Sequence, residues 1–190
     1  VESYKSSLYG FTLGAPIIKN KLFFFVNGEL ENSTSPGILW TPSQEEGGSG
    51  DNQNHISRTW IKDLKTISDF VKDKYGYDPG SYDKFDDFES KNWKLMARLD
   101  WNINKSHKLS LRFNTVKSEN DASISTSSVI TKANSNRYGV DAFAFGNSNY
   151  GFRNIVTSLS GELNSNFSSS VQNKLLVTYT HIRDSRTTKG

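Results

Sequence analysis

The chain has 190 residues, of which 34% are hydrophobic and 23% charged, with a net charge of +3 and no cysteine. Acidic and basic residues are interspersed, so the basic stripe that nucleic-acid binding requires is absent. No apolar run reaches the ~18 residues of a transmembrane helix, and no disulfide or cysteine–metal framework can form. The mean hydropathy of −0.62 is compatible with membrane-crossing strands, because these alternate apolar and polar residues.

Short and very long connections alternate along the chain. The first two strand-like segments are joined by residues 14–20, the second pair by 103–107, and the third by a Ser/Asn-rich bend. Short turns on one side and long loops on the other are typical of a transmembrane β-barrel. We therefore expect an all-β fold with antiparallel strands at 4–14, 21–32, 92–102, 107–117, 152–164 and 173–183, and external loops at 33–91 and 118–149.

Residues 93–101 show the clearest two-residue alternation. One face carries Trp93, Leu95, Ala97, Leu99 and Trp101. Tryptophan at both ends of an apolar stripe is typical of an aromatic girdle at the two membrane interfaces. Residues 21–27 are apolar on both faces, which suits material packed inside a barrel near the short turn. Half-buried strands of a soluble β-sandwich are the alternative, but loops as long as 33–91 are rare in compact soluble domains.

The first long loop contains a helical pattern. We expect a helix over 57–75, with Ser57 or Thr59 as its N-cap and Gly76 as a left-handed terminator. Packing on the loop or the barrel rim is favoured over docking of a partner. The apolar stripe consists of Trp60, Ile61, Leu64, Ile67, Val71 and Tyr75.

The sequence carries no enzyme motif, and we expect neither catalytic nor cofactor-binding residues. The three histidines, His55, His107 and His181, are too dispersed to suggest a metal site. An acidic cluster could bind a hard cation, although it lacks the spacing of a known loop and a solvated surface is favoured. Its members are Asp83, Asp86, Asp87 and Glu89.

Candidate contacts to an external substrate or partner lie in the two long loops. Aromatic residues in long loops also pack the loop itself, and that alternative stays open. The candidates are Trp40, Arg137, Tyr138, Phe143 and Phe145.

One motif resembles a known family. Residues 9–25 read YGFTLGAPIIKNKLFFF. This run is similar to the early periplasmic hairpin of TonB-dependent outer-membrane receptors of the Oar-like type, common in Bacteroidetes, except that Ala15 replaces the family's second glycine. Residues 98–109 resemble the family's next hairpin, and 75–80 resemble its first long external loop. The similarity thus runs through nearly the whole chain.

The resemblance implies a 22-stranded barrel in the bacterial outer membrane, with an N-terminal plug. Residues 1–190 would be an internal part of that barrel just after the plug, supplying roughly strands two to seven. The start of the chain lacks a signal-like pattern and its end lacks a closing aromatic strand, which also favours an internal stretch. The implied partners are the rest of the barrel and plug, outer-membrane lipid, and the TonB–ExbB–ExbD system, which would couple to the N-terminal part.

The resemblance implies that the barrel binds a substrate and imports it. Two alternatives remain. The barrel could be a scaffold that docks surface lipoproteins or secretion machinery, or the chain could be a soluble extracellular β-sandwich binding module. A TonB box and plug upstream would favour transport over the scaffold.

Overall fold

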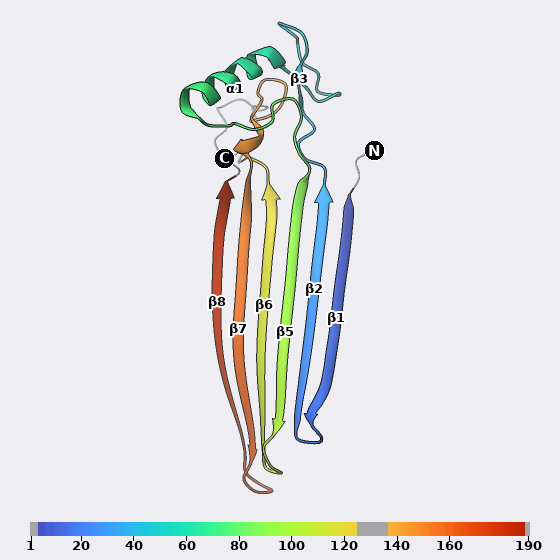
Figure 1. Cartoon of the computed structure of the whole chain (residues 1–190), viewed down its shortest axis with the longest axis vertical. Helices are drawn as coiled ribbons and strands as arrows, with labels where there is room; N and C mark the ends of the chain where they lie inside the picture. Colours follow the sequence, from blue (N-terminus) through green and yellow to red (C-terminus); the bar gives the residue numbers. More distant parts are fainter. Residues whose placement is uncertain (1–3, 125–136, 189–190) are drawn as a thin grey trace.

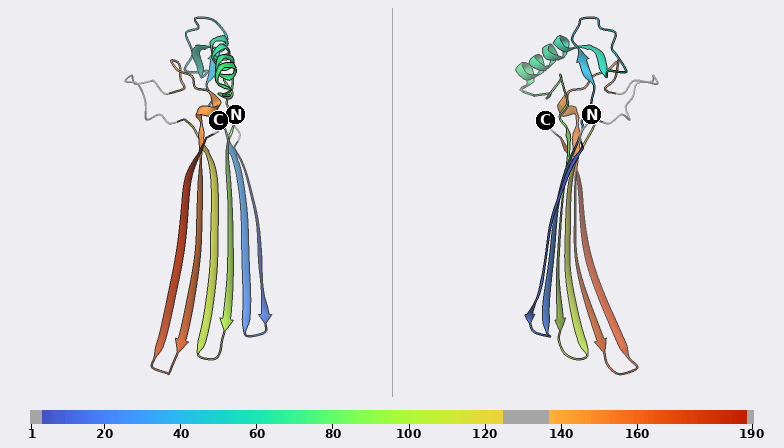
Figure 2. Two further views of the ribbon diagram at one scale, coloured as in Figure 1. Left: turned by 60° about the vertical axis from the view of Figure 1, so that its left-hand side comes forward. Right: turned by 90° about the vertical axis from the view of Figure 1, so that its right-hand side faces the viewer.

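The computed structural model describes residues 4–124 and 137–188, and one antiparallel sheet dominates it (Figure 1). The sheet order is β1-β2-β5-β6-β7-β8, so each strand pairs with the next strand of this sheet along the chain. The sheet is a single open layer whose edges are β1 and β8 (Figure 2). Its strands are β1 (Lys5–Ile18), β2 (Leu22–Ser35), β5 (Phe88–Asn102), β6 (His107–Ala122), β7 (Tyr150–Asn166) and β8 (Gln172–Thr188).

The prediction of six antiparallel strands is confirmed, whereas the strands are longer than predicted. At the end near the long loops, the strands extend beyond the residues that alternate between apolar and polar, because polar side chains there form hydrogen bonds across strands. Ser90 Oγ donates to Asn120 Oδ1 at 2.5 Å, and Ser118 Oγ donates to Asn92 Oδ1 at 2.5 Å. Such cross-strand hydrogen bonds stabilise a sheet without producing an apolar period.

The first short turn is tighter than predicted. The predicted turn at 14–20 was wrong, since β1 runs to Ile18 and only Lys19, Asn20 and Lys21 connect the strands. Asn20 takes the left-handed conformation with φ 61°. Pro16 is tolerated within β1 because this is an edge strand, and the register shifts between Pro16 and Ile18.

The two faces of the sheet differ in polarity. Paired residues on neighbouring strands share a face, so the register extends the stripe of β5 across the sheet. We call the side with Trp93, Leu95, Ala97, Leu99 and Trp101 the apolar face, and the opposite side the polar face. The apolar face also carries Tyr9, Phe11, Leu13, Leu22, Phe24, Val26, Leu30, Leu109, Leu111, Phe113, Ile155, Leu159, Leu163, Leu175, Val177 and Tyr179.

The described parts of the two long loops form a cap at one end of the sheet (Figure 1). It contains the parallel pair β3 (Thr41–Ser43) and β4 (Ile56–Trp60), the helix α1 (Ile61–Tyr75) and the 3-10 turn η1 (Gly146–Ser148). Among the described residues, the buried apolar side chains are those of Ile38, Pro42, Leu64, Pro79 and Phe85, and all of them lie in the cap. No helix in the described ranges is long and apolar enough to span a membrane.

The helix begins later than predicted. Residues 56–60 form β4 instead of the first helical turn, and Ser57 is fully buried with its hydroxyl bonded to the Val140 carbonyl at 3.3 Å. The predicted caps were therefore wrong: the N-cap is Trp60, without a side-chain cap bond. Gly76 ends the helix with φ 66°, as predicted.

The predicted packing of the helix is only partly correct. Leu64 and Ser68 are the buried residues of α1, whereas Ile67 is 49% and Tyr75 66% exposed. The buried face of α1 therefore includes fewer residues than the predicted apolar stripe.

Lowering the pH should destabilise residues 76–81, which follow α1. Asp78 Oδ1 accepts a hydrogen bond from the Gly80 backbone N–H at 2.9 Å. The same oxygen forms an ion pair with Lys72 Nζ at 3.2 Å. The Gly80 N–H, then Lys72, hold the pKa of Asp78 below its ordinary value of 3.8. Because the folded pKa is lowered, the stabilisation is present above the ordinary value and is lost as pH falls through the lowered one.

We expect hydrogen exchange of the 76–81 amides, corrected for intrinsic rates, to stay constant above about pH 5 and to accelerate as pH falls below about 4. The Asp78→Asn variant should show no such acid dependence, because its amide does not titrate in this range. An equal acid response in both proteins would contradict this role of Asp78.

Candidate functional site

The apolar face has the height of a membrane. Trp93 and Trp101 are eight residues apart on β5, which corresponds to about 27 Å at the usual rise of a strand. Apolar bands of outer-membrane barrels are about 25 Å tall. Side chains on this face are well exposed, among them Leu13 at 58%, Leu159 at 54% and Tyr179 at 67%.

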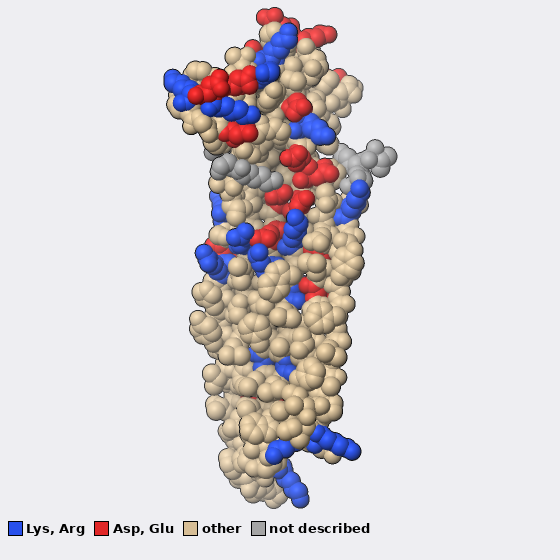
Figure 3. Space-filling view, viewed as in Figure 1, with Lys and Arg blue, Asp and Glu red and all other residues tan. Residues whose placement is uncertain are grey.

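Charged side chains border this apolar band. On the loop side, Lys117 lies directly beside Trp93, and Lys91, Glu119 and Arg153 form the next row across the strands. On the turn side, the connections carry Lys19, Lys21 and Lys105. On the face that Figure 3 shows, charges gather toward both ends of the sheet and few lie between them. This order is the one expected where a sheet passes from water through lipid and back to water.

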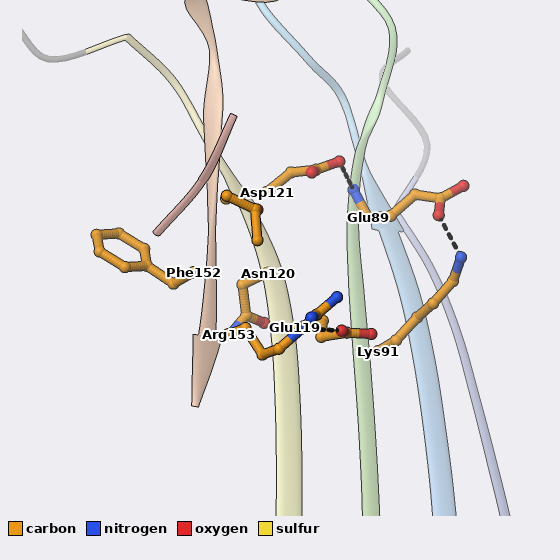
Figure 4. Close-up of a pocket in the computed structure, with 9 residues that line it drawn as sticks. Glu89, Lys91, Glu119, Asn120, Asp121, Phe152 and Arg153 are labelled. Atoms are coloured by element: carbon orange, nitrogen blue, oxygen red, sulfur yellow. Dashed lines mark hydrogen bonds and ion pairs between the residues drawn. The ribbon is translucent and has the colours of Figure 1, made fainter. Parts of the chain in front are cut away.

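The loop-side charges are paired with one another. Arg153 Nε and Lys117 Nζ approach Glu119 Oε1 at 2.5 and 3.0 Å, and Lys91 Nζ approaches Glu89 Oε2 at 2.6 Å. Four of them, Glu89, Lys91, Glu119 and Arg153, line a cavity of about 240 Å³ (Figure 4). Because acids and bases are mixed there, the cavity has no clear preference for one sign of charge.

The polar face holds a hydrogen-bonded network at the height of the apolar band. Asp100 Oδ1 accepts from Arg98 Nε at 3.0 Å, from Arg98 Nη2 at 2.9 Å and from Ser110 Oγ at 2.6 Å. Farther along the sheet, Glu162 Oε1 pairs with Lys174 Nζ at 3.1 Å. Charged groups on this face fit contact with water or with other polar groups, in contrast to the opposite face.

Phe23 and Phe25 interrupt the polar face near the short turns, because they pair with Asp100 and Arg98. The prediction that this stretch is apolar on both faces is therefore confirmed.

The predicted external contacts lie in the cap, where ring contacts hold three of them. Trp40 meets His55 edge-on at 5.4 Å between ring centroids, Phe143 meets Phe85 at 5.3 Å, and Phe145 meets Tyr82 at 6.4 Å. The structure thus brings the second long loop onto the first through Phe143 and Phe145. Arg137 is exposed and Tyr138 half-buried. Their role in binding remains a prediction.

No metal site is formed by the part of the chain that the structure describes. No group of three or more histidine, aspartate or glutamate side chains there is arranged to hold an ion. His55 contacts Trp40, and His107 Nδ1 lies 2.9 Å from Ser165 Oγ.

Sequence analysis did not single out Arg98 and Arg112 of the polar face. The register places them directly opposite each other on β5 and β6. The signal was available, because a strand that shows an apolar stripe to one side must show its charged residues to the other.

Comparison with known proteins gives no relative. No protein-family model matches the chain, and no match was found among curated proteins or solved structures.

Proposed function

We propose that this chain forms part of the wall of a bacterial outer-membrane β-barrel of the TonB-dependent transporter type, which binds a substrate outside the cell and imports it. The observation that carries the proposal is the apolar face, with its band of about 27 Å between Trp93 and Trp101. Lipid would contact this face, and the polar face would line the interior. The short turns would face the periplasm and the cap the exterior.

The open edges of the sheet support a larger ring. In lipid, each unpaired backbone N–H or C=O of β1 and β8 would cost several kcal/mol. Further strands of the same barrel, paired to both edges, would remove that cost. A soluble β-sandwich is less well supported, because no second sheet of the described residues covers the apolar face (Figure 2).

Import rests on the resemblance of residues 9–25 and 98–109 to the TonB-dependent receptors. In such a transporter, energy would come from the TonB–ExbB–ExbD system acting through a plug, and the cap would contribute to substrate capture. The cap aromatics Trp40, Phe143 and Phe145, with Arg137 and Tyr138, are the residues proposed for external contacts.

Cysteine labelling in intact cells tests the placement in the membrane. The chain has no cysteine, so single cysteines at Gln53 in the cap and Lys105 in a short turn provide unique probes once any cysteine elsewhere in the full protein is replaced. Both positions are exposed. We expect a membrane-impermeant maleimide to label Gln53→Cys in intact cells and Lys105→Cys only after the outer membrane is permeabilised. Labelling of both in intact cells would refute the orientation.

A depletion assay tests transport. Cells that lack the gene and cells with an inactive TonB–ExbB–ExbD system should leave the same solutes of a defined nutrient mixture in the medium, whereas wild-type cells remove them. If cells that lack the gene consume every solute as wild-type cells do, the barrel is not an importer of these nutrients. The scaffold function then gains support.

A further inference from the structure

Two arginines face each other on the polar face. Arg98 and Arg112 are directly paired on β5 and β6, and their row lies between those of Ala97 and Leu99, in the middle of the apolar band. Like charges directly opposite each other destabilise a sheet unless an anion compensates them. Ionisable residues at mid-membrane depth commonly mark a substrate pathway.

The Asp100 carboxylate forms hydrogen bonds with only one of the two arginines. Asp100 Oδ1 already accepts two hydrogen bonds from Arg98 and one from Ser110. The Arg112 guanidinium acts on Asp100 and Glu162 only through its charge, and it makes no hydrogen bond or ion pair with any described residue. Its five N–H donors are therefore open to another acceptor.

The space beside Arg112 has the size and lining of a ligand site. A cavity of about 540 Å³ is lined by Phe25, Met96, Arg98, Asp100, Arg112 and Asn114. Ligand sites commonly measure 300–1,000 Å³ and combine apolar walls with a few placed polar groups. On the far side of Arg112, its paired neighbour on β7 is the small Ser160, which leaves the guanidinium uncovered.

We propose that this cavity, which we call the arginine site, binds a small organic carboxylate. Arg112 would hold the carboxylate through its planar fork beside the Arg98–Asp100 pair, and Phe25 and Met96 would contact the apolar body of the ligand. The inference rests on the proposed function, in which the polar face lines the interior of the barrel and an anionic solute passes along it.

Binding of benzoate and of benzamide to the purified full-length protein in detergent tests the arginine site. Benzamide has nearly the same shape and carries no charge. By isothermal titration calorimetry we expect benzoate to bind at least about tenfold more tightly than benzamide, since a hydrogen-bonded charge pair is worth that much or more. Arg112→Gln should weaken benzoate binding about tenfold, and Arg112→Lys should weaken it less, because lysine keeps the charge but not the fork.

The matched control is Lys174→Gln, which removes a positive charge from the same face outside the cavity. It should leave benzoate binding unchanged. Equal binding of benzoate and benzamide, no benzoate binding at all, or equal losses in Arg112→Gln and Lys174→Gln would each overturn the proposal. Surface labelling of Gln53→Cys and Lys105→Cys does not depend on Arg112, so failure of the membrane placement would be seen separately.

Discussion

Replacing Leu159 with lysine should destabilise the lipid-embedded protein by about 2–4 kcal/mol, the cost of a lysine near the bilayer midplane on the lipid side of a barrel. Leu159 pairs with Phe113 and Tyr179 in the middle of the apolar band and is 54% exposed. In the proposed barrel its side chain would contact lipid, which cannot solvate an ammonium group. The measurement is the free energy of unfolding of the full-length protein in lipid vesicles, from urea titration.

The neighbouring Ser158 provides the control. It pairs with Asn114 and Thr180 on the polar face, at nearly the same height. Ser158→Lys should change the unfolding free energy by less than about 1 kcal/mol, because the ammonium group would lie in a water-accessible interior. If both variants lose the same free energy of unfolding, the two faces are in contact with the same kind of environment. The membrane assignment would then be wrong.

The faces of the sheet could be predicted from sequence because the alternation is local. The stripe from Trp93 to Trp101 fixes which side of β5 is apolar, and the structure confirms the same side on β6 and β7. Strand ends were harder to predict, since the last rows toward the cap mix polar residues with scattered aromatic ones and show no regular alternation. There Ser90 and Asn120 pair by hydrogen bonds that leave no hydrophobic period.

The start of α1 could not be predicted because distant contacts decide it. Residues 57–60 were predicted as the first turn of the helix, yet β4 pairs with β3, and the Arg58 N–H donates to the Val140 carbonyl at 2.9 Å. These partners come from both long loops. Gly76, in contrast, acts through its own backbone freedom, and its terminating role followed from the sequence.

The pairing of the two arginines in the arginine site could have been predicted from the sequence. A connection at 103–107 pairs Asn102 with Lys108, and counting back along both strands then pairs Arg98 with Arg112. The hydrogen-bond partner of each guanidinium could not be predicted from the sequence. Arg98 turns along its own strand to Asp100 two residues away, and this leaves Arg112 unpaired.

A methyl group at Gly37 should loosen the cap while the sheet stays folded. A Cβ at this position would overlap the backbone oxygen of Asp86, so the backbone itself would have to shift. Gly37 joins β2 to the cap, and Asp86 leads back into β5. Their sequence neighbours Ile38 and Phe85 belong to the buried apolar residues of the cap. The clash therefore falls at the base of the cap's small core.

We expect Gly37→Ala to cost about 1–3 kcal/mol, as overpacking of a well-packed site does. Limited proteolysis of the full-length protein in lipid should show faster cleavage within 36–87, with the strands still protected. Gly10→Ala is the matched control, because its Cβ would meet only the Gly28 oxygen at 3.4 Å and the Glu29 Cγ at 3.7 Å. Alanine is also preferred over glycine within a strand. If both variants are cleaved at the same rate, the close approach of Gly37 to Asp86 does not hold the cap on the sheet.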